Sequence, residues 1–139
     1  MQSVTVRREF DADATAVRAA MGDVGPFMRA AGFDGVTVEG DAVRIANEVG
    51  PVRIELRLDV VEDSETVLAY DQREGIFETM TTRYELTERD GTTTVEATTE
   101  FALDVAAVGS FLDATVIKFQ RRRELTAQLD YVETRVAGD

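Results

Sequence analysis

Polar side chains fall at several positions where the alternation of the sequence predicts an inward-facing, apolar surface. Six residues share this property: Asn47, Gln72, Glu78, Thr82 and Thr99 on predicted strands, and Arg122 on a predicted helix. A buried polar group without a partner costs roughly 1 to 3 kcal/mol, so each must meet another polar group, water or a ligand. The pattern therefore predicts a cavity with a polar end.

Glu78 is the candidate for chemistry in this set. The expected strand pairing places it opposite Tyr70, with Arg122 above both. Three explanations stay open: a structural ion pair or solvent-reaching edge, contact with a ligand, and acid–base catalysis. In the catalytic explanation Glu78 is the base, while Tyr70 or Arg122 polarises a carbonyl group.

Apolar residues on the same predicted face would form the wall of the cavity. They are Leu56, Leu58, Met80, Tyr84, Phe101, Leu112 and Phe119. Together with Tyr70 and the six polar residues they make up the predicted ligand-binding set. The chain has no cysteine and no histidine, which excludes thiolate and imidazole chemistry and the metal sites built on them. We expect no cofactor and no metal.

Acidic residues dominate the charge of this 139-residue chain. It has 27 acids against 15 bases, a net charge of −12, and Lys118 is its single lysine. This balance argues against nucleic acid as a partner, and it fits either an ordinary acidic surface or adaptation to high internal salt. No apolar run approaches about 18 residues and the N-terminus alternates, so we expect a cytoplasmic protein without a membrane span. The length predicts one domain, residues 1–139.

The periodicity predicts one strand, two short helices, a run of strands and a long helix. The first strand spans residues 4–10, and Asp11 or Asp13 can cap the helix that follows it. Pro26 suits the start of a second short helix. From residue 35 to residue 103 apolar and polar residues alternate in six segments, which predicts an antiparallel meander.

Loop lengths in this meander are constrained, because residues paired across an antiparallel ladder point to the same face. Two-residue turns satisfy the constraint at Gly40-Asp41, Gly50-Pro51 and Asp90-Gly91. The two strands that meet near residue 75 need a three-residue loop instead. Residues 73–75 supply it, which pairs Tyr70 with Glu78 and gives Gly75 a left-handed conformation.

The C-terminal segment, residues 104–136, reads as one uninterrupted helix with Asp104 as its N-cap. At 1.5 Å per residue it would be roughly 50 Å long, far more than an average helix. Its apolar stripe runs through Phe119 and then from Leu125 onward, and Arg122 falls within it. We therefore predict that this helix lies across the sheet as one wall of the cavity.

The order of elements resembles that of the START-like superfamily, the SRPBCC or Bet v 1-like helix-grip group. The resemblance is strongest over Phe10–Val17, where an acid-alanine pair leads into the first helix, and the run Phe119–Leu125 is similar in character to the polyketide cyclase/dehydrase-like branch. It implies an α+β helix-grip fold: a seven-stranded antiparallel sheet curled around a long C-terminal helix, with two short helices after the first strand. It also implies that the first strand joins the meander's ends, and that a cavity between sheet and helix holds apolar molecules.

Three functions remain open on the sequence alone. The first is a binding or carrier protein, monomer or homodimer, for a hydrophobic or amphipathic small molecule such as a lipid, an isoprenoid or a polyketide-like compound. The second is a cofactor-independent polyketide cyclase or dehydratase that uses a buried carboxylate. The third is a protein-interaction module that docks through Arg121, Arg122 and Arg123.

Overall fold

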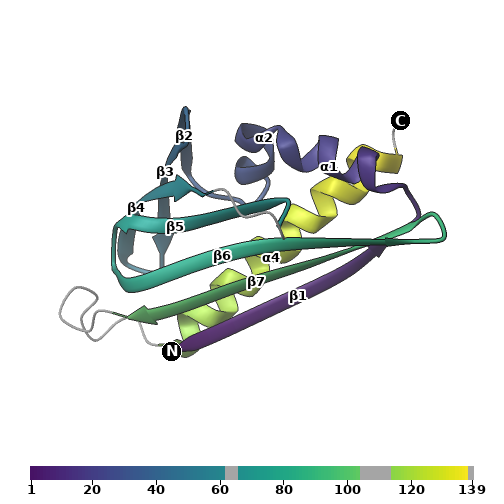
Figure 1. Ribbon diagram of the computed structural model, residues 1–139. Coiled ribbons are helices and arrows are strands. Elements are labelled where there is room, and N and C mark those ends of the chain that lie inside the picture. Colours follow the sequence, from purple (N-terminus) through teal and green to yellow (C-terminus); the bar gives the residue numbers. More distant parts are fainter. Residues whose placement is uncertain (62–65, 104–113, 138–139) are drawn as a thin grey trace.

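The computed structural model describes residues 1–61, 66–103 and 114–137 (Figure 1). The helices and strands are β1 Gln2–Phe10, α1 Ala14–Gly22, α2 Val24–Arg29, β2 Gly35–Glu39, β3 Ala42–Val49, β4 Val52–Val60, β5 Leu68–Glu74, β6 Phe77–Arg89, β7 Thr92–Leu103 and α4 Ala114–Ala137. This order matches the predicted one. None of the described helices is long and apolar enough to cross a membrane.

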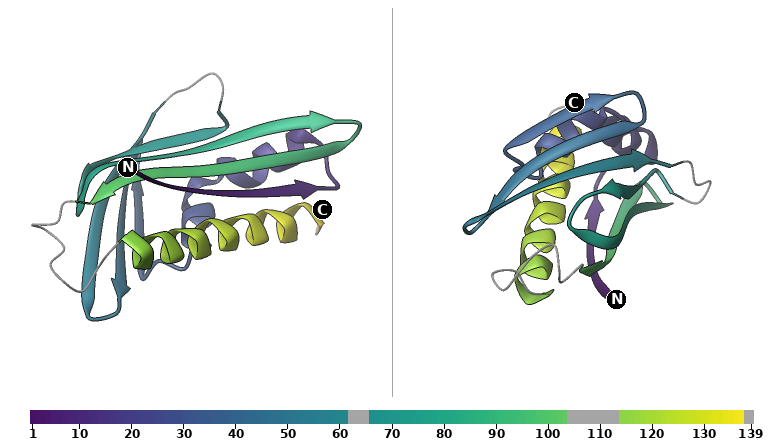
Figure 2. Two further views of the ribbon diagram at one scale, coloured as in Figure 1. Left: turned by 90° about the horizontal axis from the view of Figure 1, so that it is seen from below. Right: turned by 90° about the vertical axis from the view of Figure 1, so that its left-hand side faces the viewer.

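The seven strands form one antiparallel sheet in the order β1-β7-β6-β5-β4-β3-β2. Strands β2 to β7 follow one another as a meander, and β1 pairs with β7 at one edge. The sheet curls around α4, which lies along its inner side, while α1 and α2 cover the remaining opening (Figure 2). The predicted α+β helix-grip architecture is confirmed. The expectation that the first strand joins both ends of the meander is wrong, because β1 and β2 are opposite edges of an open sheet.

Local signals explain why these elements form where they do. The side chain of Asp13 accepts a hydrogen bond of 2.9 Å from the backbone N–H of Ala16, which caps α1 as expected. Asp90 and Gly91 have φ angles of 52° and 81°, the left-handed values of a two-residue type I′ hairpin. This turn sets the β6–β7 register, and the Gly40-Asp41 and Gly50-Pro51 turns set their registers in the same way.

The predicted loop at residues 73–75 is wrong. Tyr70 lies opposite Thr82 instead of Glu78, because the β5–β6 pairing ends at Asp71 and Thr81 and the chain then makes a wider connection. The register differs from the predicted one by an even number of residues, so the inward face of β5 is the predicted one. Gly75 has a positive φ of 156°, a backbone conformation that L residues rarely adopt.

The connection between β5 and β6 is held by a side chain. Gln72 donates a 2.8 Å hydrogen bond to the carbonyl oxygen of Phe77 and accepts a 3.1 Å bond from its N–H. An added Cβ on Gly75 would overlap the side chains of Leu56 and Gln72. Glycine is therefore required here by close approach of the backbone to its neighbours.

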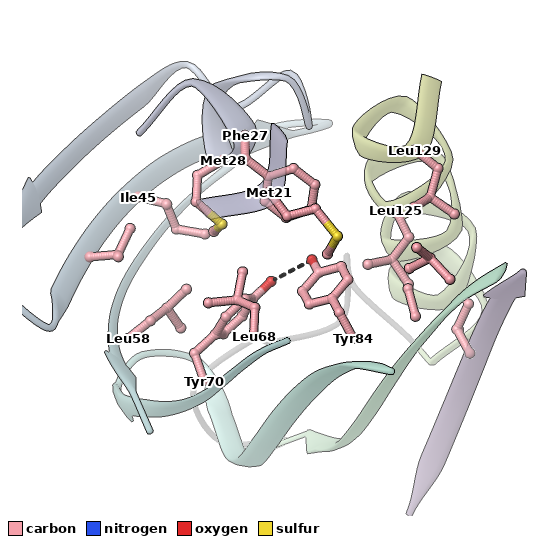
Figure 3. Close-up of a cluster of buried hydrophobic side chains, with 14 of the residues drawn as sticks. Met21, Phe27, Met28, Ile45, Leu58, Leu68, Tyr70, Tyr84, Leu125 and Leu129 are labelled. Atoms are coloured by element: carbon pink, nitrogen blue, oxygen red, sulfur yellow. Dashed lines mark hydrogen bonds between the residues drawn. The ribbon is translucent and has the colours of Figure 1, made fainter. Parts of the chain in front are cut away.

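Helix α4 begins its described part at Ala114, so the predicted segment 104–113, with its N-cap, lies outside the described residues. Its buried residues are Ile117, Arg121, Glu124, Leu125, Gln128, Leu129 and Val132. This stripe contacts a core that the sheet, α1 and α2 complete (Figure 3). The second half of the stripe is the predicted one. The first half is rotated about the helix axis relative to the prediction, because the inward face runs through Ile117 instead of Phe119 and each residue turns the helix by about 100°.

Candidate functional site

A hollow lies between the inner face of the sheet and the first half of α4. Its lining consists of Phe33, Ile45, Asn47, Ile54, Leu56, Leu58, Tyr70, Phe77, Met80, Ile117, Gln120, Arg121 and Glu124. Most of these side chains are apolar, and all are buried except Phe33 and Gln120, which are partly exposed. The free volume is about 30 Å³, enough for about two water molecules.

A buried ion pair forms the polar end of the hollow. Arg121 and Glu124 have exposed fractions of only 7% and 3%, and Nη1 of Arg121 donates to Oε1 of Glu124 at 2.5 Å. Nη2 of Arg121 donates to the hydroxyl of Thr82 at 3.0 Å. Asn47 and Gln120 each donate an amide N–H to Oε2 of Glu124 at 3.2 Å. The carboxylate thus has three donors.

One donor of this cluster is left over. Nε of Arg121 is buried and has no hydrogen-bond partner among the described residues. Desolvation by burial is the largest single effect on the pKa of Arg121 and lowers it. The charge of Glu124, the neighbouring Tyr70 and Tyr84, and the hydrogen bond to Glu124 together outweigh it, so the pKa is raised above its ordinary value. Arg121 is therefore a fixed cation in the lining of the hollow, and its Nε is the nitrogen without a partner within the described ranges.

A second polar chain runs beside the ion pair. The hydroxyls of Tyr70 and Tyr84 lie 3.2 Å apart (Figure 3). The Tyr84 hydroxyl also donates to Oε1 of Gln128 at 2.5 Å. Burial, followed by the neighbouring Tyr70, raises the pKa of Tyr84 well above its ordinary value of 10. Tyr84 is consequently a neutral hydrogen-bonding group at physiological pH, and Tyr70 is part of the lining of the hollow.

The sequence matches one protein family over almost its whole length. The model of the polyketide cyclase / dehydrase and lipid transport family matches residues 1–137. The chain belongs to this family. No curated protein matches it in sequence.

Solved structures that resemble this family member support the fold. The Zhui aromatase/cyclase from a Streptomyces species has a TM-score of 0.77 at 18% identity, covering 98% of this chain and 93% of the other. A protein from Thermus thermophilus has a TM-score of 0.76 at 16% identity, covering 99% and 98%. A START superfamily protein from Mycobacterium smegmatis has a TM-score of 0.74 at 13% identity, covering 98% and 97%. At these identities the likeness shows the fold alone.

The structure brings part of the predicted ligand-binding set together in the hollow of this family member. Asn47, Leu56, Leu58, Tyr70 and Met80 are in its lining. A second group is buried but is not part of the lining: Thr82, Tyr84, Thr99 and Phe101. Gln72 is partly buried on β5, where its side chain bonds to Phe77, and Leu112 lies outside the described residues. The ligand-contacting roles of these residues stay predictions.

Three predicted inward orientations are wrong. Glu78 is exposed, because a β-bulge between Phe77 and Thr79 inserts an extra residue into β6 and turns Phe77 inward in its place. Phe119 is 64% exposed, and Arg123 lies over its ring at 5.9 Å. Glu78 therefore cannot act as a base inside the hollow.

Arg122 is the third residue predicted to point inward that is exposed instead. It donates a 3.3 Å hydrogen bond to the carbonyl oxygen of Thr5 at the outside of β1. The adjacent Arg121 takes the inward position instead, since neighbouring residues on a helix point about 100° apart. A docking patch made of residues 121–123 is excluded, because Arg121 is buried.

Sequence reasoning missed the ion pair that dominates the site. Arg121 and Glu124 lie four and seven residues after Ile117, the spacing of one helical face, and Gln128 continues it. A stripe drawn through Ile117 instead of Phe119 would have found them. The described residues contain no group of histidine, cysteine, aspartate or glutamate side chains that could hold a metal ion.

Proposed function

We propose that this protein binds or carries a small amphipathic molecule in the hollow between the sheet and α4. The observation that carries the proposal is the polar end of the hollow, where a buried ion pair leaves Nε of Arg121 without a partner among the described residues. The apolar side chains would contact the body of the ligand, and Arg121 would hold one polar atom. Apolar walls with a few converging polar groups are typical of small-molecule sites.

The ion pair itself supports a functional role. A buried salt bridge rarely stabilises a fold more than apolar residues of the same size, because both charges lose their hydration. A fold that needed only a core could place apolar residues at Arg121 and Glu124, as it does at Leu125 and Leu129. The family description, which names lipid transport and polyketide cyclisation, points to apolar or partly apolar ligands.

The size of the hollow sets a condition on binding. Its volume is about 30 Å³, whereas pockets that enclose drug-sized ligands have about 300 to 1,000 Å³. The walls must therefore separate when such a ligand enters. Phe33 and Gln120 are the partly exposed residues of the lining, and the flexible thioether side chain of Met80 can repack at low cost.

A cyclase or dehydratase that uses Glu78 has no support, because that carboxylate points to solvent. The carboxylate that is buried, Glu124, is engaged by three donors and by the charge of Arg121. A general base must be free to accept a proton from the substrate. Binding without catalysis is the function that the geometry favours.

Two substitutions on adjacent positions of α4 test the proposal. Ile117 is buried in the lining of the hollow, whereas Val116 is 38% exposed. In a Nile red fluorescence titration with displacement by farnesol or dodecanoate, Val116→Phe should bind the dye as the wild type does. Ile117→Phe should weaken binding at least about tenfold, which corresponds to about 1.4 kcal/mol. Thermal melts followed by circular dichroism check that both variants fold.

The outcome against the proposal is equally specific. If the wild type binds Nile red no better than Ile117→Phe does, the dye does not occupy the hollow. If no apolar compound displaces the dye, the hollow is a structural feature and the carrier function is wrong.

A further inference from the structure

The two charges in the lining of the hollow cancel each other. Arg121 and Glu124 are the only charged residues of that lining among the described residues, and they contact each other directly. The three other polar residues of the lining, Asn47, Tyr70 and Gln120, carry no charge. The polar end is thus electrically neutral as a whole, although it contains a guanidinium group.

Two of the three guanidinium nitrogens of Arg121 have a hydrogen-bond partner among the described residues. Nη1 is bound to Glu124 and Nη2 to Thr82, which leaves Nε as the buried atom without a partner in the described part of the chain. A ligand carboxylate is normally held by two parallel N–H groups of an arginine. Because Nη1 and Nη2 already have partners, Nε is the nitrogen left for a ligand, and one such nitrogen suits an acceptor that needs one hydrogen bond.

We propose that the ligand presents an uncharged oxygen, such as a ketone carbonyl, an ester carbonyl or a hydroxyl, to Nε of Arg121, and that Glu124 determines this preference. The inference rests on the proposed function and specifies its ligand class. A neutral oxygen accepts the free N–H and leaves the ion pair intact. An anionic headgroup is disfavoured, because it would lie beside the buried carboxylate of Glu124 in a medium of low dielectric constant.

The role of Glu124 can be separated from that of Arg121. Glu124→Gln removes the negative charge while retaining an oxygen that can accept from Arg121. Arg121 then has an uncompensated positive charge, so the preference should change from neutral to anionic ligands. Glu133→Gln is the matched control, because it removes one negative charge from an exposed position of the same helix.

The test compares two probes of equal length, 2-undecanone and undecanoate, by isothermal titration calorimetry at pH 7.5. The wild type and Glu133→Gln should bind the ketone at least about tenfold more tightly than the carboxylate. Glu124→Gln should bind the carboxylate more tightly than the ketone. A measurement on the wild type alone gives a second check: the affinity for undecanoic acid should fall as the pH rises from 5.5 to 8, while that for 2-undecanone stays constant.

Each contrary result has a distinct meaning. If the wild type binds undecanoate as tightly as 2-undecanone across this pH range, the inference is wrong and the proposed function stands. If Glu124→Gln folds and keeps the preference for the ketone, Glu124 does not determine ligand charge and the inference is wrong in that part. If neither probe binds the wild type, both the inference and the proposed function are wrong.

Discussion

Replacing one partner of the Arg121–Glu124 ion pair should lower the free energy of unfolding far more than replacing both partners by apolar residues. Arg121→Met leaves the carboxylate of Glu124 buried with only the amides of Asn47 and Gln120 at 3.2 Å. Glu124→Leu leaves the guanidinium with only Thr82 at 3.0 Å. Leaving one partner of a buried pair uncompensated destabilises a protein by about 3 to 5 kcal/mol, so each single variant should lose that much.

The double variant should lose much less than the sum of the two. It places two apolar side chains against an apolar lining, and its remaining defect is the amide of Asn47, which loses its acceptor. A buried donor without a partner costs about 1 to 3 kcal/mol, compared with about 6 to 10 kcal/mol for the two single changes added together. Residues that interact directly show this kind of non-additivity.

The assay is urea unfolding of the wild type and the three variants, followed by circular dichroism at pH 7.5. Arg8 and Asp130 form an ion pair in which Asp130 is 64% exposed, and they provide a control cycle. Exposed pairs couple by about 0 to 1 kcal/mol, so the same treatment should give nearly additive effects there. The reasoning is refuted if Arg121→Met costs less than about 1 kcal/mol, or if the double variant loses the full sum of the single losses.

Three further outcomes follow from the structure. Gly75→Ala should destabilise the protein by about 1 to 3 kcal/mol in urea unfolding, because a Cβ there overlaps Leu56 and Gln72. The control Gly22→Ala should be neutral or stabilising, because a Cβ at Gly22 meets nothing within 4 Å. Equal losses in the two variants would contradict the steric argument. The folded state raises the pKa of Tyr84, so the protonated side chain contributes stability that is lost as the pH rises above about 10. Above that pH the free energy of unfolding should fall less steeply in Tyr84→Phe than in the wild type. The melting temperature should rise between low and molar salt, since the net charge is −12, and an unchanged or falling value would exclude adaptation to high salt.

The fold could be predicted because its signals are local. Alternating apolar residues mark each strand, and turn residues such as Asp90 and Gly91 set the register of a hairpin by themselves. The connection after β5 has no such signal, because the side chain of Gln72 holds it. The predicted register of β5 against β6 was wrong by an even number of residues, so the inward face of β5 was predicted correctly but its partner residues on β6 were not.

The site was harder to predict, for two physical reasons. A β-bulge before Thr79 places Phe77 on the inner face where Glu78 was predicted. The sequence does not show this, because Ile76 and Phe77 are both apolar and either could point inward. On α4, Arg121 and Glu124 satisfy each other, so the inward face carries charges that sequence patterns assign to solvent.

The isoleucine side chains offer the most direct measurement on the central claim that the hollow holds an apolar molecule. The chain has four isoleucines, of which Ile45, Ile54 and Ile117 are in the lining and Ile76 is not. In an NMR titration of methyl-labelled protein with 2-undecanone, the methyl signals of the three lining residues should shift with one common affinity, while that of Ile76 should move little. No saturable shift of the three, or equal shifts of all four, would contradict the account.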